Sequence, residues 1–233
     1  MIASLQNVVA IDGPSGAGKS SMARALAKKL EILYVDTGAM YRALGVYFHH
    51  QGFSLEDESG IAEKLSHIGF EYGCSADCLV KVNGEDLTQQ IREHTASDYA
   101  SRISKLEKVR EYLVAFQRTL SDTRTCVVEG RDIGTVVFPQ AFCKIYFTAS
   151  VEVRAQRRFQ QLSDKGESGL DIDKVKADIE DRDKRDMERE NSPLKQASDA
   201  ILFDTSDMTK DLVLDNLEKL VREKALQAQL KIG

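Results

Sequence analysis

Five short apolar runs alternate with amphipathic segments along this chain, and the alternation predicts the fold. The runs cover 7–12, 33–36, 125–129, 144–149 and 200–204. Unbroken apolar runs of this length are typical of strands buried on both faces, and such strands are usually parallel. The sequence therefore predicts an α/β fold whose core is a five-stranded parallel sheet with helices on both faces.

The segments between the runs carry apolar residues at helical spacing. Within 21–30, Met22, Leu26 and Leu30 recur every four residues and so share one face. Longer helices are expected over 39–51, 106–121 and 210–227, with shorter ones over 89–93 and 95–104. The helix over 210–227 is expected to turn four residues inward: Leu214, Leu217, Leu220 and Val221.

The stretch 53–104 breaks this rhythm and predicts a small inserted α+β lobe. Residues 70–72 and 79–82 alternate like half-exposed antiparallel strands, and Asn83-Gly84 is a strong hairpin signal. The expected organisation is a core over 1–52, the lobe over 53–104 and the rest of the core over 105–233.

A charged helix is expected over 171–190, after a glycine-rich loop at 165–169 that should be mobile. Arg182, Arg185, Asp186 and Arg189 have the spacing of one helical face. Two interpretations are open: a solvated helix stabilised by ion pairs, or a lid over about 158–190 that closes arginines over phosphates and excludes water.

A phosphate-binding loop follows the first predicted strand and opens the first predicted helix. Its glycines allow a curled backbone whose N–H groups can surround a polyphosphate. Lys19 supplies a cation for the outer phosphates, and the Ser20 hydroxyl is a candidate Mg²⁺ ligand. The predicted set that binds the nucleoside triphosphate is Gly13, Pro14, Ser15, Gly16, Ala17, Gly18, Lys19, Ser20 and Ser21.

Composition narrows the class of protein. The 233 residues carry a net charge of −5, which argues against a nucleic-acid partner. No run is long enough to span a membrane, and the N-terminus lacks the features of a signal peptide, so a cytoplasmic protein is expected. Nothing demands an oligomer, and a monomer is expected. The four cysteines are expected to be free thiols, with Cys126 and Cys143 buried.

Further features select a reaction beyond triphosphate binding. The chain has no Asn-Lys-x-Asp sequence for guanine recognition and no apolar strand that ends in adjacent Asp and Glu. Arginines instead recur beside acidic residues at predicted strand ends. Phosphoryl transfer to a second anionic substrate needs such arginines to hold the acceptor and offset charge repulsion.

The motifs together resemble bacterial cytidylate kinase. The resemblance rests on 11–20, 36–42 and 129–139, on Arg182-Asp183-x-Arg185-Asp186 with Arg189, and on Ser192-Pro193-Leu194, in the same order over nearly the whole chain. It implies a P-loop nucleoside monophosphate kinase of pyrimidine metabolism that transfers the ATP γ-phosphate to CMP or dCMP with Mg²⁺. The inserted lobe fits the enlarged monophosphate-binding region of the bacterial enzymes.

The resemblance also implies roles for individual residues. Thr37 would help to seat the monophosphate, and Arg42, Arg131 and Arg189 would hold its phosphate. The cytosine would be read by Ser101, Arg110 and Asp132, and the sugar and phosphates contacted by Arg182 and Asp186. The transferring phosphoryl group would be stabilised by Lys19, Arg131, Arg182 and Arg189. The ATP side would be bordered by Arg157 and Arg158.

The proposed role of Asp132 agrees with the chemistry of cytosine. A carboxylate accepts a hydrogen bond from the amino group at C4 and is repelled by the carbonyl of uracil. From the residues alone, Asp132 could instead pair with Arg131 or cap a turn, and Arg110 is typical of an exposed helix residue. Two other functions also stay open: a P-loop kinase with another acceptor, such as shikimate or gluconate, and a regulatory module that binds ATP without turnover.

Overall fold

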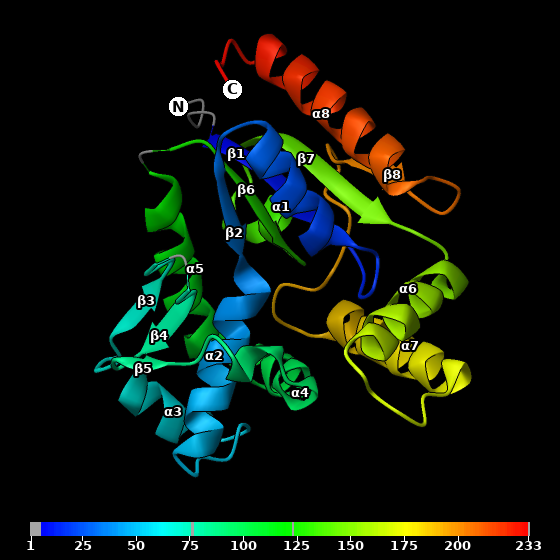
Figure 1. The fold of residues 1–233 in the computed structure, drawn as a ribbon. Coiled ribbons are helices and arrows are strands. Elements are labelled where there is room, and N and C mark those ends of the chain that lie inside the picture. The colour runs from blue at the N-terminus through cyan, green and yellow to red at the C-terminus, as the bar shows by residue number, and fades with distance from the viewer. Residues whose placement is uncertain (1–5, 76, 123, 233) are drawn as a thin grey trace. The chain divides into compact units, whose positions relative to one another are not determined.

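A computed structural model describes residues 6–75, 77–122 and 124–232 (Figure 1). Residues 1–35 together with 120–233 form one compact unit, the first unit, and 36–119 form the second unit. The sequence predicts no signal peptide at the N-terminus. Most of that segment, residues 1–5, lies outside the described part of the chain. The finer boundaries at 52/53 and 104/105, and the lid, stay predictions.

The first unit is built on the predicted parallel sheet. Its strands run in the order β2-β6-β1-β7-β8, and β1 pairs in parallel with both β6 and β7. All five strands are parallel and flanked by helices, so the predicted P-loop kinase fold is confirmed. The strands are β1 (Gln6–Asp12), β2 (Leu33–Asp36), β6 (Cys126–Gly130), β7 (Ala141–Thr148) and β8 (Ile201–Asp204).

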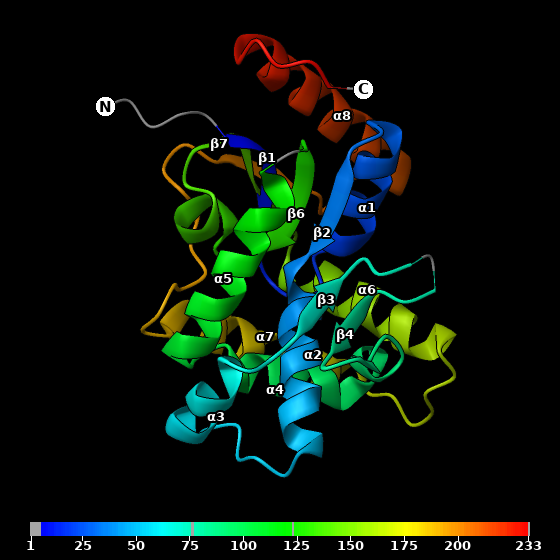
Figure 2. The same ribbon diagram turned by 90° about the vertical axis from the view of Figure 1, so that its left-hand side faces the viewer.

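Two helices of the first unit, α1 (Lys19–Lys29) and α8 (Lys210–Gln227), lie side by side (Figure 2). Their apolar faces join one core with the inner strands, which includes Leu26 and Val127. The predicted inward face of α8 was partly wrong. The buried positions are Val213, Leu217, Val221 and Ala225, while Leu214 and Leu220 are only half-buried at its edge.

The other helices of this unit are α6 (Val151–Asp164) and α7 (Ile172–Glu188), which pack against each other (Figure 1). Ser150 caps α6 by accepting a hydrogen bond from the Val153 N–H. A π-helical turn, η2 (Ile133–Val137), follows β6 and packs on β1 and β7. Such π-turns are frequent at functional sites.

The second unit contains the predicted hairpin. Strands β3 (Phe70–Tyr72), β4 (Val80–Val82) and β5 (Glu85–Asp86) form an antiparallel sheet. Asn83 and Gly84 join β4 to β5 with φ angles of 51° and 80°, the left-handed conformation that an Asn-Gly hairpin turn requires. The helices are α2 (Thr37–His50), α3 (Glu58–Leu65), the short η1 (Gln90–Arg92), α4 (His94–Ile103) and most of α5 (Glu107–Ser121).

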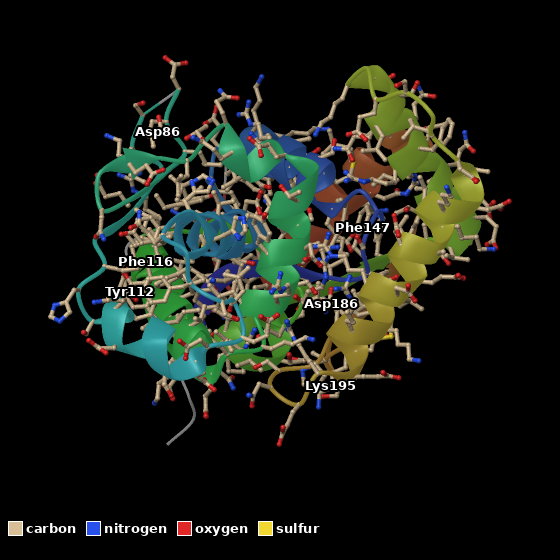
Figure 3. All side chains as sticks on the ribbon, turned by 90° about the horizontal axis from the view of Figure 1, so that it is seen from below. Asp86, Tyr112, Phe116, Phe147, Asp186 and Lys195 are labelled. Atoms are coloured by element: carbon tan, nitrogen blue, oxygen red, sulfur yellow. The ribbon has the colours of Figure 1, made fainter. Side chains whose placement is uncertain are left out.

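Aromatic side chains join α5 to this small sheet. Tyr112 and Phe116 lie one turn apart on α5 (Figure 3), and both rings contact Phe70 edge to face, with centroids 6.5 and 5.1 Å apart. Such pairs add about 0.5–1.5 kcal/mol each beyond the buried area. The sheet is therefore anchored to a helix rather than standing as an isolated hairpin.

All four cysteines are free thiols. Burial raises the pKa of Cys126 and Cys143 to about 12, which keeps both thiols protonated and confirms them as core residues. Cys78 is also buried, and Cys74 is exposed. Across the described ranges, no helix has the length and apolar character needed to cross a membrane.

Candidate functional site

The phosphate-binding loop leaves the carboxyl end of β1 and enters α1, as its motif requires. Gly13 has φ 149°, and a Cβ there would lie 2.0 Å from the Phe147 carbonyl oxygen. Gly18 is the N-cap of α1 and has φ 98°. Only glycine fits these two positions, because a side chain would strike the sheet at the first and strain the backbone at the second.

Lys19 is buried at the base of this loop. Its side chain donates a 2.7 Å hydrogen bond to the Pro14 carbonyl, and the residue is 5% exposed. Burial, and then the charges of Arg131 and Arg182, lower the pKa of Lys19 to about 7, while Glu129 opposes the shift. Because its surroundings disfavour the charged form of Lys19, a polyanion bound beside it would stabilise that charged form strongly.

The loop is held from outside by α6 and α7. Arg154 donates to the Ser15 carbonyl at 2.9 Å, and Arg157 donates to the Ala17 carbonyl at 2.8 Å. Asp183 accepts a 2.7 Å hydrogen bond from the Ser15 N–H. The loop conformation is therefore fixed by side chains of two helices as well as by its glycines.

A second group of site residues follows β6, next to β1 in the sheet. Buried Asp12 at the end of β1 accepts hydrogen bonds of 2.8 Å from the N–H groups of both Ile133 and Gly134. Burial raises the pKa of Asp12 to about 7, although these two hydrogen bonds oppose the shift. Asp12 thus ties the start of the phosphate-binding loop to the turn after Arg131 and Asp132.

One face of α7 contacts that second group. Asp186, labelled in Figure 3, accepts a hydrogen bond from Arg131 Nε at 2.8 Å. Arg189 Nη2 lies 3.6 Å from Asp132 Oδ1, and both side chains are nearly buried. Burial alone would raise the pKa of Asp186. The charges of Arg131, Arg182 and Arg189 outweigh that effect and keep this pKa below its usual value. The structure therefore brings these five predicted residues together.

The predicted face of α7 needs one correction. Arg185 was placed beside Arg182 and Asp186 by its spacing, but it is exposed. The buried residue of that turn is Asp183, which continues the apolar stripe of Val175 and Ile179. The interpretation of α7 as a wholly solvated helix is wrong, since its acidic residues Asp183 and Asp186 are buried.

In the second unit, the start of α2 holds Thr37 and Arg42 together with a carboxylate. Asp36 caps the helix by accepting from the Ala39 N–H at 2.8 Å, and its other oxygen lies 3.1 Å from Arg42 Nη2. Thr37 is buried at the first turn of the same helix. The carboxylate of Asp36 therefore fixes the direction of the Arg42 guanidinium.

Ser101 and Arg110 are both buried in the second unit. The typical reading of Arg110 as an exposed helix residue is wrong: it is 5% exposed, and its guanidinium lies 5.7 Å from the centre of the Tyr41 ring. Tyr41 precedes Arg42 on α2. The contact therefore places Tyr41, Arg42 and Arg110 in one region of the second unit. Ser101 lies on α4, which packs against α2.

The remaining candidates differ in surroundings. Arg157 is anchored to the loop and also donates to the Thr205 hydroxyl and carbonyl, each at 2.9 Å. Arg158 donates to Gln161 on the same helix. Ser20 and Ser21 are exposed in the first turn of α1. Within the described residues, no group of three His, Cys, Asp or Glu side chains could form a metal site of its own.

Sequence reasoning missed four residues that shape the site. Asp12, Glu129 and Asp183 occur in the sequence analysis only as parts of motifs, and Arg154 has no predicted role. Two signals could have found them: a charged residue that continues an apolar helical stripe, and a carboxylate at the end of a buried strand. The residues are Asp12, Glu129, Arg154 and Asp183, and all four are buried.

The arrangement can hold and activate a polyphosphate. Curled backbone amides, a buried lysine and neighbouring arginines all concentrate positive charge where phosphoryl oxygens would lie. No nucleophilic side chain is needed when the acceptor is itself an anion. This set of groups is suited to phosphoryl transfer rather than to a covalent enzyme intermediate.

Comparisons with known proteins agree with this chemistry. A family model described as cytidylate kinase matches residues 9–223. The chain is 42% identical to the cytidylate kinase of Thermotoga petrophila over 217 residues, which covers 93% of this chain and 97% of the relative. It is 45% identical to the cytidylate kinase of Nocardia farcinica over 219 residues, covering 93% and 94%.

Among solved structures, an uncharacterized protein from Eubacterium ventriosum shares the fold. Its TM-score is 0.51 at 12% identity, with 94% of this chain and 99% of that chain covered. Family membership rests instead on the sequence matches, which extend over almost the whole chain and include the phosphate-binding loop, the turn after β6 and α7. The chain belongs to the cytidylate kinase family.

Proposed function

We propose that this protein is a nucleoside monophosphate kinase that transfers the γ-phosphate of ATP to CMP or dCMP and forms CDP or dCDP. The observation that carries the proposal is the buried Lys19 in a complete phosphate-binding loop, with Arg131 and Arg182 close enough to lower its pKa. One cation would suffice for binding a triphosphate. A cluster of three is suited to a transition state that spreads charge over two phosphate groups.

The donor side consists of the loop itself. Its backbone N–H groups would surround the β- and γ-phosphates of ATP, and Lys19 would leave the Pro14 carbonyl for the phosphate oxygens. Arg157 and Arg158 would border this side. Arg157 is already anchored to the loop at Ala17.

Acceptor roles are proposed for residues of each unit, taken separately. In the first unit Arg131 and Arg189 would hold the phosphate of CMP, Asp132 would accept from the cytosine amino group, and Arg182 and Asp186 would contact the sugar and phosphates. In the second unit Thr37 and Arg42 would serve the phosphate, while Ser101 and Arg110 would serve the base. Five of these residues are buried and the other four, all arginines, are half-buried, which supports roles in fixed positions rather than on a solvated surface; the buried ones are Thr37, Ser101, Arg110, Asp132 and Asp186.

The residues present fit a Mg²⁺ ion that arrives with the nucleotide. Mg²⁺ usually takes most of its ligands from phosphates and water and only one or two from the protein. The exposed Ser20 hydroxyl in the first turn of α1 would be that protein ligand. When bound, Mg²⁺ would neutralise charge on the β- and γ-phosphate oxygens.

We also propose that the protein is a monomer located in the cytoplasm. ATP and CMP are nucleotides of the cytoplasm, and we place the protein there with small molecules as its partners. Each chain carries a complete set of the proposed donor and acceptor residues, which fits a monomer. Light scattering of the purified protein measures the assembly directly.

A panel of acceptors tests the proposal. Purified protein is given ATP and Mg²⁺ with CMP, dCMP, UMP, AMP, shikimate or gluconate, and ADP release is followed. We expect CMP and dCMP to give the highest kcat/KM. A higher value with another acceptor would identify a different P-loop kinase, and ATP binding without ADP release from any acceptor would identify a regulatory module.

A further inference from the structure

We propose that Arg154 and Asp183 are positioning residues that aim the backbone of the phosphate-binding loop at the donor triphosphate. The inference rests on the donor role proposed for this loop. Neither residue has a role in the assignments drawn from the family resemblance. The pair is buried, with side chains 11% and 8% exposed, and forms an ion pair that joins α6 to α7.

The pair holds one loop residue at both of its backbone groups. Asp183 Oδ1 accepts from the Ser15 N–H at 2.7 Å, and Arg154 Nη1 donates to the Ser15 carbonyl at 2.9 Å. Arg154 Nε also donates to the Ala149 carbonyl at 3.0 Å, which fixes the guanidinium to the end of β7. The backbone of Ser15 is therefore hydrogen-bonded to both Arg154 and Asp183, which also form an ion pair with each other.

Because the N–H and the carbonyl of Ser15 are both held in place, the orientations of the two adjoining peptide planes are fixed as well. A trans peptide is planar, so its C=O and N–H point in opposite directions. Because the Ser15 carbonyl points at Arg154, the N–H of Gly16 points away from α6. Arg157 has the same effect on the N–H of Gly18 through the Ala17 carbonyl. The arginines thereby direct two amides of the kind that surround a phosphate.

Asp183 acts on the peptide that precedes Ser15. Its carboxylate fixes the Ser15 N–H, so the Pro14 carbonyl of the same peptide must point the opposite way. That carbonyl accepts the hydrogen bond from Lys19 Nζ at 2.7 Å. Asp183 therefore also sets the place from which Lys19 moves to the phosphates.

The packing around the loop supports the same conclusion. Gly16 has φ 72°, and a Cβ there would lie 3.1 Å from the Arg154 carbonyl oxygen and 3.2 Å from Ile179 Cδ1. The loop therefore lies directly against α6 and α7. A change in the geometry of this helix pair would move the loop with it.

The spacing along α7 separates this role from the acceptor side. Asp183, Asp186 and Arg189 follow one another at intervals of three residues. Asp183 contacts the donor loop, whereas Asp186 and Arg189 contact Arg131 and Asp132. Loss of Asp183 should therefore weaken the use of ATP more than the use of CMP.

The test compares Asp183→Ala with Asp181→Ala, an exposed aspartate on the same helix. Dissociation constants for ATP are measured by calorimetry on the intact protein without CMP, and KM is measured for both substrates. We expect Asp183→Ala to weaken ATP binding about 10- to 100-fold, the range of a lost hydrogen bond to a charged group, and to change the KM for CMP less than about threefold. Asp181→Ala should behave as the wild type.

A double-mutant cycle with Arg154→Met shows whether the two residues act as one unit. We expect the effect of the double variant on ATP binding to be smaller than the product of the two single effects. Where Asp183→Ala does not fold, Asp183→Asn, which keeps the side-chain shape, gives the same two readings. Equal losses for ATP and CMP, or unchanged ATP binding in a folded variant, would overturn the inference. A wild-type protein that does not bind ATP would instead overturn the proposed function.

Discussion

Asp186 and Arg131 form a nearly buried ion pair across 2.8 Å, between α7 and the turn after β6. The carboxylate orients the guanidinium that is proposed to hold the acceptor phosphate. It also raises the pKa of Arg131, against the effect of burial. A permanent charge on Arg131, held in a fixed direction, is what a phosphate contact requires.

Replacing Asp186 with Ala should impair the acceptor side selectively. We expect kcat/KM for CMP to fall about 10- to 100-fold, because the arginine loses its charged partner and the sugar loses a proposed contact. The dissociation constant for ATP should stay within about twofold. Initial rates at varied CMP measure this, and Asp178→Ala, an exposed change on the same helix, is the control. A loss confined to ATP binding would contradict the assignment.

Asp132→Asn should relax the choice of base. The amide of Asn can donate a hydrogen bond to the uracil carbonyl, which a carboxylate repels. We expect the ratio of kcat/KM for CMP to that for UMP to fall about 10- to 100-fold, the range of one mismatched buried polar contact. The ratio is the informative quantity, because losing the Arg189 contact would affect both substrates alike. An unchanged ratio would remove Asp132 from base recognition.

Binding of ATP should be linked to proton uptake through Lys19. Its pKa of about 7 leaves it largely neutral at pH 8, and a bound polyanion restores the usual preference for the charged form. We expect uptake of close to one proton per ATP at pH 8 and weaker binding at pH 8 than at pH 6. Calorimetry in buffers of different ionisation enthalpy measures the uptake. Binding without proton uptake at pH 8 would show that Lys19 is already charged.

Gly13→Ala should destabilise the protein strongly. The new methyl group would lie 2.0 Å from the Phe147 carbonyl oxygen. This oxygen belongs to the backbone of a buried strand, so moving it away would cost considerable free energy. We expect a loss of about 2–4 kcal/mol in the free energy of unfolding, measured by urea denaturation. Gly166→Ala, at φ 82° with no atom within 4 Å, should cost only about 1 kcal/mol. Equal losses at the two positions would rule out a steric cause.

The parts of the fold that could be predicted are those set by local pattern. The five parallel strands, the phosphate-binding loop and the Asn83-Gly84 turn each depend on a few adjacent residues, although β8 is less buried than its apolar run indicates, with Leu202 exposed. The core face of α8 was harder. Its leucines are spread around the helix. Val213 is buried while Leu214 lies half-buried against the same core, because contacts outside the helix set its rotation.

The polar side of the site was less predictable, since charged residues on a helix do not reveal which face is buried. Arg185 and Asp183 are both charged and lie two positions apart, yet only Asp183 is buried. Its partners Ser15 and Arg154 are distant in sequence, so their contact appears only once the chain has folded. The same holds for Asp12 and the amides of Ile133 and Gly134.

Transfer of one phosphoryl group from ATP to a cytidine monophosphate can be observed directly. The most direct measurement follows ATP radiolabelled at its γ-phosphate, with Mg²⁺ and equimolar CMP and UMP. We predict that the label appears in CDP well ahead of UDP, without free phosphate, and that Lys19→Met lowers the rate at least about 100-fold. Label that accumulates as inorganic phosphate, or that reaches CDP and UDP equally, would contradict selective phosphoryl transfer to CMP.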